Sequence, residues 1–349
     1  MQLRHTLTLT GALVLGSLVP GCGPAEELSE ELPQAEVPQQ QTAPGEETGT
    51  VESAASTSGF TSHFRTWLTN NGYEPAYNLI RADLVGGSYG GKASSTDTVV
   101  NQPVIFIHGN SDKAIGTGTL GQSGWTASVD FFLSKGYKTS ELYATTWGPA
   151  DASLSAYQYH SKTNVMKVRK FIEAVKAYTG ASKVDIIAHS MGVTLARKAV
   201  LGGYATDSLE GGQYYVGPSL TTSVDTFVGI AGANLGLTSC YQTGPGTPTC
   251  GSTNGLYPGY WNGVSVSGRS AYLNNLLSSS GYEGAFRYTI WSTDDEVIGY
   301  NSMVYGSYTP RIPGQTGEKV YSSYPYGHFN VKDLTQNVQL NMVKFHTIP

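Results

Sequence analysis

One serine in this chain stands between two very small neighbours, in the stretch Ala188-His189-Ser190-Met191-Gly192. A serine hydroxyl is a poor nucleophile at neutral pH, so it needs a base, an acid that orients the base, and donors for the oxyanion. A G-x-S-x-G turn from strand to helix exposes such a serine, and its flanking positions must be small because two backbones pass close together. Ala188 here replaces the first glycine. Small-x-Ser-x-Gly turns also occur by chance, so the assignment of Ser190 as a nucleophile depends on its surroundings.

A second stretch that could take part in chemistry reads HGNS at residues 108–111 and follows a continuous apolar run. In hydrolases with such a turn, a loop after an upstream strand supplies one oxyanion amide and the residue after the serine supplies the other. We therefore expect the backbone amides of Asn110 and Met191 to form an oxyanion hole. His108 and His189 lie beside these positions, and we interpret both as shaping their loops rather than transferring protons.

Two histidines lie downstream of Ser190, and they differ in their surroundings. His328 stands in a loop between the last expected strand and the closing helix, where a base is found when the chain order is serine, acid, histidine. His346 lies three residues from the C-terminus at the end of that helix, where a solvated side chain is the simpler interpretation. We therefore predict that His328 is the base.

Three adjacent acids, residues 294–296, follow a late expected strand. An acid is needed to fix the imidazole tautomer and to stabilise the imidazolium. We favour Asp295, because the apolar Val297 two positions later would anchor the loop. Asp294 is the second choice, and Asp225 is the third because it lies within a strand pattern.

The elements that must position these residues alternate along the chain. Continuous apolar runs indicate strands that are covered on both faces, and apolar residues three and four apart indicate helices. We expect strands at 77–85, 103–107, 137–143, 183–188, 224–230, 286–291 and 319–324, and helices at 125–133, 162–178, 191–201 and 331–345. Such alternation predicts an α/β fold with a mostly parallel sheet flanked by helices.

The first 21 residues are typical of an export signal. Arg4 and His5 precede an apolar run at 7–19 that is too short to span a bilayer as a mature helix. The run ends in Val-Pro-Gly-Cys, which resembles a bacterial lipobox, in which cleavage precedes the cysteine and the thiol carries the lipid. We expect lipidation of Cys22 and contact with a lipid bilayer through that anchor. The alternative is an ordinary secretory signal in which Cys22 is a bystander.

Residues 22–59 are rich in Pro, Gln, Thr, Ser and Glu, and they include eight glutamates but no Lys, Arg or aromatic residue. Such a segment cannot bury enough apolar surface to offset its ordering entropy, so we predict a disordered acidic linker. Residues 60–349 hold 20 basic and 18 acidic side chains. This balance does not suggest a nucleic-acid partner. We expect an exported protein, held on the bacterial outer surface or in the periplasm as a lipoprotein, or secreted.

The remaining cysteines, Cys240 and Cys250, flank a loop rich in Gly and Pro. A disulfide across this loop fits an oxidising compartment, and two free buried thiols are the alternative. Their spacing excludes a CxxC metal site, and the sequence holds no His and carboxylate set with metal-ligand spacing. We therefore expect neither a metal nor another cofactor.

The segment 232–284 has weak periodicity and many Gly, Ser, Tyr and Asn residues. A long irregular insertion of this kind is either a functional cap or a region whose elements are wrongly assigned. Four of its aromatic residues, Tyr257, Tyr260, Trp261 and Tyr272, could form an exposed binding surface or pack the loop onto the core.

From about Tyr77 to its C-terminus, the chain resembles α/β-hydrolase lipases of the class 2 type, which carry the Ala-His-Ser-Met-Gly elbow matched at 188–192. It is also similar to extracellular poly(3-hydroxybutyrate) depolymerases, which share this elbow and a His-Gly-Asn loop matched at 108–110. The resemblance implies an α/β-hydrolase catalytic domain at 60–349 with a cap-like insertion at 232–284. It also implies an ester substrate, either a lipid or a polyester.

The resemblance assigns the triad to Ser190, Asp295 and His328, and the oxyanion hole to Asn110 and Met191. The expected activity is that of a serine carboxylic-ester hydrolase, a lipase or esterase that forms an acyl-enzyme. Two alternatives remain at this point. One is a polyhydroxyalkanoate depolymerase with the same chemistry, and the other is a surface lipoprotein that keeps the hydrolase fold only for binding.

Overall fold

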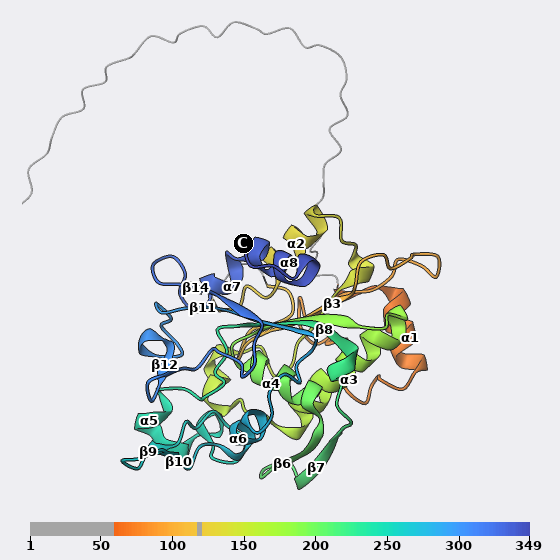
Figure 1. Ribbon diagram of the computed structural model, residues 1–349. Coiled ribbons are helices and arrows are strands. Elements are labelled where there is room, and N and C mark those ends of the chain that lie inside the picture. Colours follow the sequence, from red (N-terminus) through yellow and green to blue (C-terminus); the bar gives the residue numbers. More distant parts are fainter. Residues whose placement is uncertain (1–58, 117–120) are drawn as a thin grey trace, which may run out of the picture. The chain divides into compact units, whose positions relative to one another are not determined.

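The computed structural model of the protein describes residues 59–116 and 121–349 (Figure 1). The signal peptide predicted at 1–21, the lipidation of Cys22 and nearly all of the acidic linker predicted at 22–59 lie outside the described residues, so they stay predictions. Within the described ranges, the helices are too short or too polar for any of them to cross a bilayer.

The centre of the described chain is one eight-stranded sheet (Figure 1). Its strands are β1 (Gly59–Phe60), β2 (Ser88–Gly90), β3 (Val104–Ile107), β4 (Leu142–Thr145), β5 (Val184–His189), β8 (Val224–Ile230), β11 (Phe286–Ser292) and β14 (Gly317–Tyr321). Their spatial order is β1-β2-β4-β3-β5-β8-β11-β14. From β4 to β14 all neighbours pair in parallel, whereas β2 runs antiparallel to β4.

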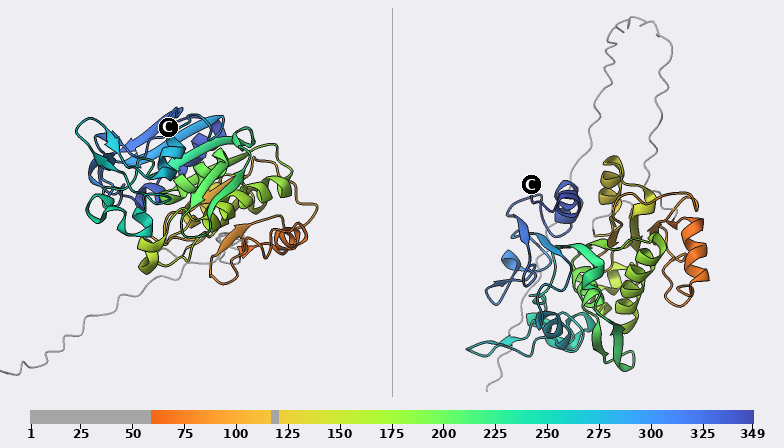
Figure 2. Two further views of the ribbon diagram at one scale, coloured as in Figure 1. Left: turned by 90° about the horizontal axis from the view of Figure 1, so that it is seen from below. Right: turned by 45° about the vertical axis from the view of Figure 1, so that its right-hand side comes forward.

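Helices cover both faces of this sheet (Figures 1 and 2). One face carries α1 (Ser62–Asn70), α3 (Lys162–Thr179), α4 (Met191–Leu201) and α6 (Ala271–Leu277). The other face carries α2 (Thr126–Ser134), α7 (Asn330–Asp333) and α8 (Gln336–Phe345). This three-layer arrangement confirms the predicted α/β-hydrolase fold with a mostly parallel sheet.

Strand β3 shows why the central strands read as continuous apolar runs. Ile105 and Ile107 pack into the core on the α3 and α4 side, while Val104 and Phe106 pack against the α2 and α8 side. All four side chains are fully buried. A strand covered on both faces therefore has no polar alternation, and this is the pattern that the sequence displays.

The three helices that flank the central strands lie within a residue or so of where the sequence predicts them. In α3, the Ser161 side chain accepts a hydrogen bond from the Asn164 amide at the start, and Gly180 ends the helix with φ of 73°. The closing helix is broken instead of continuous, because the chain leaves helical geometry at Leu334 between α7 and α8. The Gln339 side-chain amide donates to the Lys332 carbonyl and so satisfies a group that the break exposes.

The strand predicted at 77–85 is wrong, because this segment is a series of turns and the antiparallel edge strand β2 comes later. Arg81 explains the departure. Its buried guanidinium donates to the carbonyls of Thr146 and Gly148 and pairs with Asp83. These bonds hold the backbone of Arg81 at φ of 47°, which a strand cannot accommodate.

Short elements extend from the sheet. The hairpin of β6 (Gly203–Asp207) and β7 (Gly212–Gly217) was not predicted, and a further small pair joins β12 (Met303–Val304) to β13 (Ser307–Tyr308). The insertion (residues 232–284) holds α5 (Cys240–Thr243), β9 (Tyr260–Trp261), β10 (Val266–Ser267) and α6. Its aromatic residues divide between the two expected roles, because Tyr272 is buried against His160 whereas Tyr260 and Trp261 are exposed.

Candidate active site

The serine elbow is a sharp corner between β5 and α4. Ser190 has φ of 53° and ψ of −128°, a strained backbone conformation for a residue with a side chain, and its amide donates to the Ile230 carbonyl of the neighbouring strand β8. A Cβ at Gly192 would overlap the His108 carbonyl oxygen. Glycine is therefore required on the helix side of the corner, and the alanine at 188 is tolerated on the strand side, where it is fully buried.

The HGNS loop lies directly against this corner. A Cβ at Gly109 would come within 2.9 Å of both the Ser190 Cβ and the His189 Nδ1, which is closer than side chains normally approach. A side chain at 109 would therefore push the loop away from the serine. The two stretches that the sequence singled out are in contact through this glycine.

Three polar side chains form one hydrogen-bonded line. His328 Nε2 lies 3.0 Å from Ser190 Oγ, and His328 Nδ1 lies 2.8 Å from Asp295 Oδ2. An ionised carboxylate only accepts hydrogen bonds, so Nδ1 carries a proton and Nε2 is free to accept the serine proton. The structure thus brings together the three side chains that the sequence selected from separate regions of the chain.

Asp295 is held by its own loop. Its Oδ1 accepts hydrogen bonds from the amides of Val297, at 2.9 Å, and Ile298, at 2.7 Å. The reason given for preferring Asp295 is wrong in detail, because the Val297 side chain is 38% exposed and the fully buried Ile298 anchors the loop. Asp294 is exposed, and among the described residues the carboxylate that pairs with the His328 ring is that of Asp295.

The rival candidates Asp225 and His346 contact each other instead. His346 Nε2 lies 3.0 Å from Asp225 Oδ2, and Lys183 Nζ lies 2.8 Å from Asp225 Oδ1. Asp225 stands near the start of β8, whereas Ser190 follows the end of the parallel strand β5. The pair therefore lies at the opposite end of the parallel strands from the serine elbow.

Two further residues hold the histidine, and the sequence predicted neither of these contacts. Glu296 Oε2 accepts the His328 backbone amide at 2.7 Å, and His189 Nε2 lies 3.0 Å from the His328 carbonyl oxygen. Burial, with the nearby His328, lowers the pKa of His189 well below its usual value, so this ring is neutral. Adjacency to Asp295 was the only available signal for Glu296, and the interpretation of His189 as a loop-shaping residue agrees with its contact.

His108 also shapes its loop. Its Nδ1 donates to the Gly109 carbonyl at 2.7 Å, and its Nε2 accepts the Trp147 amide at 3.0 Å. Burial lowers the pKa of His108 to about 4, against the opposing charge of Asp112. A neutral ring is required by these contacts, because a protonated Nε2 could not accept the Trp147 amide.

A buried ion pair joins the HGNS loop to the helix that follows His328. Lys332 Nζ lies 2.9 Å from Asp112 Oδ2, and it also donates to Ser123 Oγ and the Gly124 carbonyl. Both charged side chains are almost fully buried. Loss of Lys332 would leave the buried Asp112 carboxylate without its cation and is expected to be strongly destabilising. Loss of Asp112 should cost less, because Lys332 Nζ also lies 3.2 Å from Asp333 Oδ1.

The two expected oxyanion donors, the amides of Asn110 and Met191, are available. Within the described ranges neither amide donates a hydrogen bond to another protein group. Met191 is the first residue of α4, so its amide has no partner inside the helix and lies at the positive end of the helix dipole. The geometry therefore leaves both groups free to bind a developing negative charge, and their role stays a prediction.

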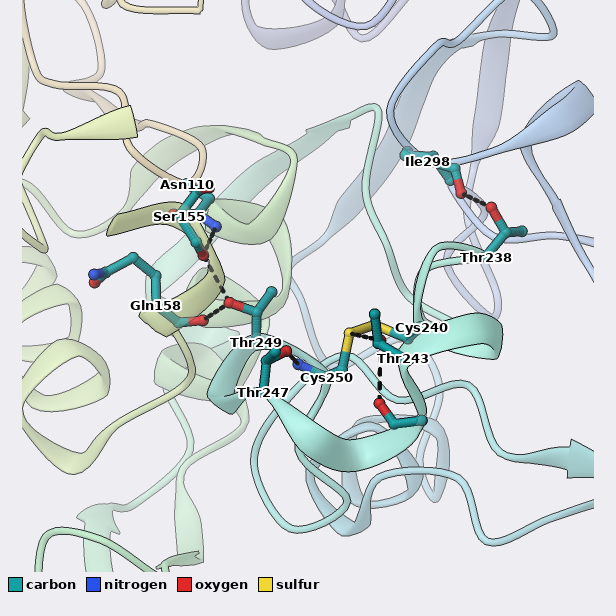
Figure 3. Close-up of a disulfide and its surroundings, with 11 residues drawn as sticks. Asn110, Ser155, Gln158, Thr238, Cys240, Thr243, Thr247, Thr249, Cys250 and Ile298 are labelled. Atoms are coloured by element: carbon teal, nitrogen blue, oxygen red, sulfur yellow. Dashed lines mark hydrogen bonds between the residues drawn. A yellow bond between two sulfur atoms is a disulfide. The ribbon is translucent and has the colours of Figure 1, made fainter. Parts of the chain in front are cut away.

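Cys240 and Cys250 form the predicted disulfide (Figure 3). The bond closes the loop between α5 and the 3-10 helix η5 (Pro248–Cys250). Both half-cystines are buried, so the disulfide is an internal part of the insertion.

Comparison with known proteins identifies the family of this chain. The sequence matches the family model described as Lipase (class 2) over residues 101–341, a range that contains all three side chains of the hydrogen-bonded line. Among solved structures, Aspergillus fumigatus lipase B is similar at 14% identity and a TM-score of 0.46, over 76% of this chain and 58% of that one. A Bacillus licheniformis lipase, BlEst2 in propeptide form, is similar at 12% identity and a TM-score of 0.46, over 75% of this chain and 54% of that one. The chain thus spans little more than half the length of these two lipases.

Proposed function

Because the chain belongs to the class 2 lipase family of α/β hydrolases, we propose that it hydrolyses carboxylic esters through a serine nucleophile. The family places it among the lipases and esterases, and the residue roles and the covalent route are the proposal. The observation that carries it is the line from Ser190 Oγ through the His328 ring to Asp295 Oδ2, with hydrogen bonds of 3.0 and 2.8 Å.

In the first half of the reaction, Ser190 Oγ attacks the ester carbonyl carbon while its proton moves to His328 Nε2. Asp295 keeps the ring in the required tautomer and stabilises the imidazolium that forms. The carbonyl oxygen becomes an oxyanion, which the amides of Asn110 and Met191 bind. His328 then protonates the leaving alcohol oxygen, the ester C–O bond breaks, and an acyl-serine remains.

The second half repeats these steps with water. His328 Nε2 removes a proton from a water molecule, whose oxygen attacks the acyl carbon and forms a second tetrahedral oxyanion. Collapse returns the proton from His328 to Ser190 Oγ and releases the carboxylic acid. Glu296 and His189 hold the histidine backbone throughout, because each bonds a main-chain group of His328 rather than its ring.

The natural substrate is proposed as an ester of a lipid or a polyester. Release of acid from triglyceride emulsions, compared with clearing of poly(3-hydroxybutyrate) granules, separates a lipase from a polyester depolymerase. A binding protein with a hydrolase fold would attack neither substrate. Fold alone does not select among these substrates, so the comparison must be made with purified protein.

We also propose that the protein is exported and held at a membrane through lipid on Cys22. Support comes from the lipobox-like ending of the apolar run at 7–19. Mass spectrometry of the mature N-terminus tests this, because lipidation predicts a chain that starts at Cys22 with added acyl mass. A mature chain that lacks this mass would contradict the proposal.

The activity is tested by Ser190→Ala, assayed with p-nitrophenyl esters of several chain lengths. Loss of the nucleophile is expected to lower kcat by at least about 10⁴-fold. Undiminished turnover by the folded variant would rule out the serine mechanism. Thr243→Val is a suitable control, because the Thr243 hydroxyl bonds within the disulfide loop and touches none of the proposed catalytic groups.

A further inference from the structure

The two proposed oxyanion donors are held in different ways. Met191 begins a helix that is packed into the core, whereas Asn110 lies in the loop after β3. His108 and the Asp112–Lys332 pair anchor that loop on either side of Asn110, and the Asn110 side chain adds an anchor of its own. Its Nδ2 donates to the Ser155 carbonyl at 2.9 Å, and its Oδ1 accepts from Ser111 Oγ at 3.1 Å. The position of the Asn110 amide therefore depends in part on where the Ser155 carbonyl is held.

Ser155 is not held by burial. It lies in the 3-10 helix η2 (Ala152–Tyr157), in which every residue is exposed. A second donor reaches its carbonyl, because Thr249 Oγ1 lies 2.7 Å from the Ser155 oxygen and 2.5 Å from the Gln158 oxygen. The Thr249 side chain is nearly buried, and the single proton of its hydroxyl is shared between the Ser155 carbonyl, in the middle of η2, and the Gln158 carbonyl just after it.

Thr249 is in turn held by the disulfide loop. It stands next to Cys250 in η5, and the Leu256 amide donates to its carbonyl at 2.6 Å. On the other side of the disulfide, Thr238 Oγ1 donates to the Ile298 carbonyl at 3.0 Å. Figure 3 shows the side-chain hydrogen bonds on the two sides of the sulfur–sulfur bond, with Asn110, Ser155 and Thr249 on one side and Thr238 and Ile298 on the other.

We propose that Thr249 is a positioning residue for the oxyanion hole: its hydroxyl holds the Ser155 carbonyl that anchors Asn110, and the Cys240–Cys250 disulfide holds Thr249 in place. The inference rests on the proposed function, because it assigns the Asn110 amide to the oxyanion. Ile298 also bonds Asp295 through its amide, so the same disulfide loop reaches both the oxyanion loop and the acid loop.

Loss of the Thr249 hydroxyl should act on the transition state. An oxyanion donor binds the charge that develops during reaction, so its displacement lowers kcat with little change in KM. Removal of a donor costs about 10²- to 10³-fold in kcat, and displacement of a donor that remains present should cost less. We expect roughly a 10-fold loss of kcat, with an equal loss of affinity for an alkyl boronic acid that forms a tetrahedral adduct with the serine.

The test compares Thr249→Val with Thr249→Ser, which keeps the hydroxyl, and with Thr243→Val as a control in the same loop. All variants are assayed for kcat, KM and boronic acid affinity, after circular dichroism and thermal unfolding show that they are folded. The proposal predicts the loss in Thr249→Val, recovery in Thr249→Ser and no loss in Thr243→Val. Unchanged kcat and affinity in Thr249→Val, or an equal loss in Thr249→Ser, would overturn it.

Ser190→Ala is measured beside these variants, so that two failures can be told apart. If Ser190→Ala stays active, the proposed function fails. If Ser190→Ala is inactive while Thr249→Val is unchanged, only the positioning role fails. The disulfide is tested by the double variant Cys240→Ser, Cys250→Ser. In this background Thr249→Val should cause little additional loss of kcat, because the disulfide that holds Thr249 is already absent. A full 10-fold additional loss would show that the disulfide does not hold Thr249.

Discussion

The two sides of the proposed oxyanion hole are built differently. The elbow side lies between a fully buried strand and a helix that is almost entirely buried, and the Ser190 amide is tied to the next strand. The loop side ends a buried strand too, but its Asn110 side chain rests on an exposed segment that the insertion holds. One half of the site is therefore held by the sheet alone, whereas the other half also has a contact that depends on the insertion.

This difference indicates which regions of the sequence can vary without loss of the fold. The elbow is fixed by contacts between neighbouring strands, so changes there disturb the core. The loop side is joined by hydrogen bonds between residues 45 and 94 positions apart in the chain. Changes in the insertion can therefore alter the rate of reaction while the sheet stays intact.

The largest expected effect breaks the triad while both oxyanion donors remain. In Asp295→Asn, the amide NH₂ would donate to His328 Nδ1 and force the proton onto Nε2, which could then no longer accept the serine proton. Serine hydrolases lose about 10⁴-fold in kcat from this change. Asp294→Asn is the matched control, because Asp294 is exposed, and its kcat should be unchanged. Comparable losses in both variants would remove Asp295 from its assigned role.

On the elbow side, Gly192→Ala would insert a methyl group against the His108 carbonyl. Overpacking between two backbones should lower the free energy of unfolding by at least about 3 kcal/mol, as measured by urea denaturation. Gly246→Ala in the insertion is the control, because nothing lies within 4 Å of its added Cβ. If both variants unfold at the wild-type urea midpoint, Gly192 is not packed tightly against the His108 carbonyl.

One residue of β5, the strand that leads to the elbow, makes the stability of the protein depend on pH. Burial raises the pKa of Asp185 to about 7, despite hydrogen bonds from the Gln102 side chain and the Thr226 amide. Between about pH 4 and 7 the unfolded chain releases this proton while the folded protein keeps it, so this residue makes stability fall as pH rises. At pH 8 the free energy of unfolding of Asp185→Asn should therefore exceed that of wild type by roughly 4 kcal/mol, and at pH 4 the two should be nearly equal. Parallel stability curves for the two proteins would contradict this assignment.

The smallest of these effects concerns the loop side. Removal of the disulfide in Cys240→Ser, Cys250→Ser frees a short loop, which should lower the free energy of unfolding by about 2.5 kcal/mol. Hydrogen exchange should quicken at the amides of residues 249–256 and stay slow in β5 and α4. Equal acceleration in both regions would mean that the insertion and the elbow are not independent.

The sequence was sufficient to predict the parts of the molecule that local patterns determine. Continuous apolar runs predicted β3, β5 and β8, and the small residues around Ser190 predicted the corner between β5 and α4. The chain order serine, acid, histidine identified His328 as the base and limited the preferred choice of acid to residues 294–296. Asp295 was preferred for its neighbour Val297, which is exposed, so the choice agrees with the hydrogen bond although its reason does not.

The contacts that the sequence could not predict depend on the folded backbone. Glu296 and His189 both bond main-chain groups of His328, and main-chain partners leave no pattern of residue types. The same is true of Thr249, whose hydroxyl reaches carbonyl groups more than 90 positions away. The strand expected at 77–85 failed for a related reason, because the buried Arg81 bonds carbonyls of a distant loop.

The most direct measurement of the central claim is the site of covalent attachment of a fluorophosphonate. The full chain is treated with the reagent, digested and mapped by mass spectrometry, beside Ser190→Ala and His328→Ala. The account predicts one adduct, on Ser190, that is absent from Ser190→Ala and forms far more slowly in His328→Ala. An unlabelled wild-type protein, or an adduct on another residue that persists in Ser190→Ala, would contradict it.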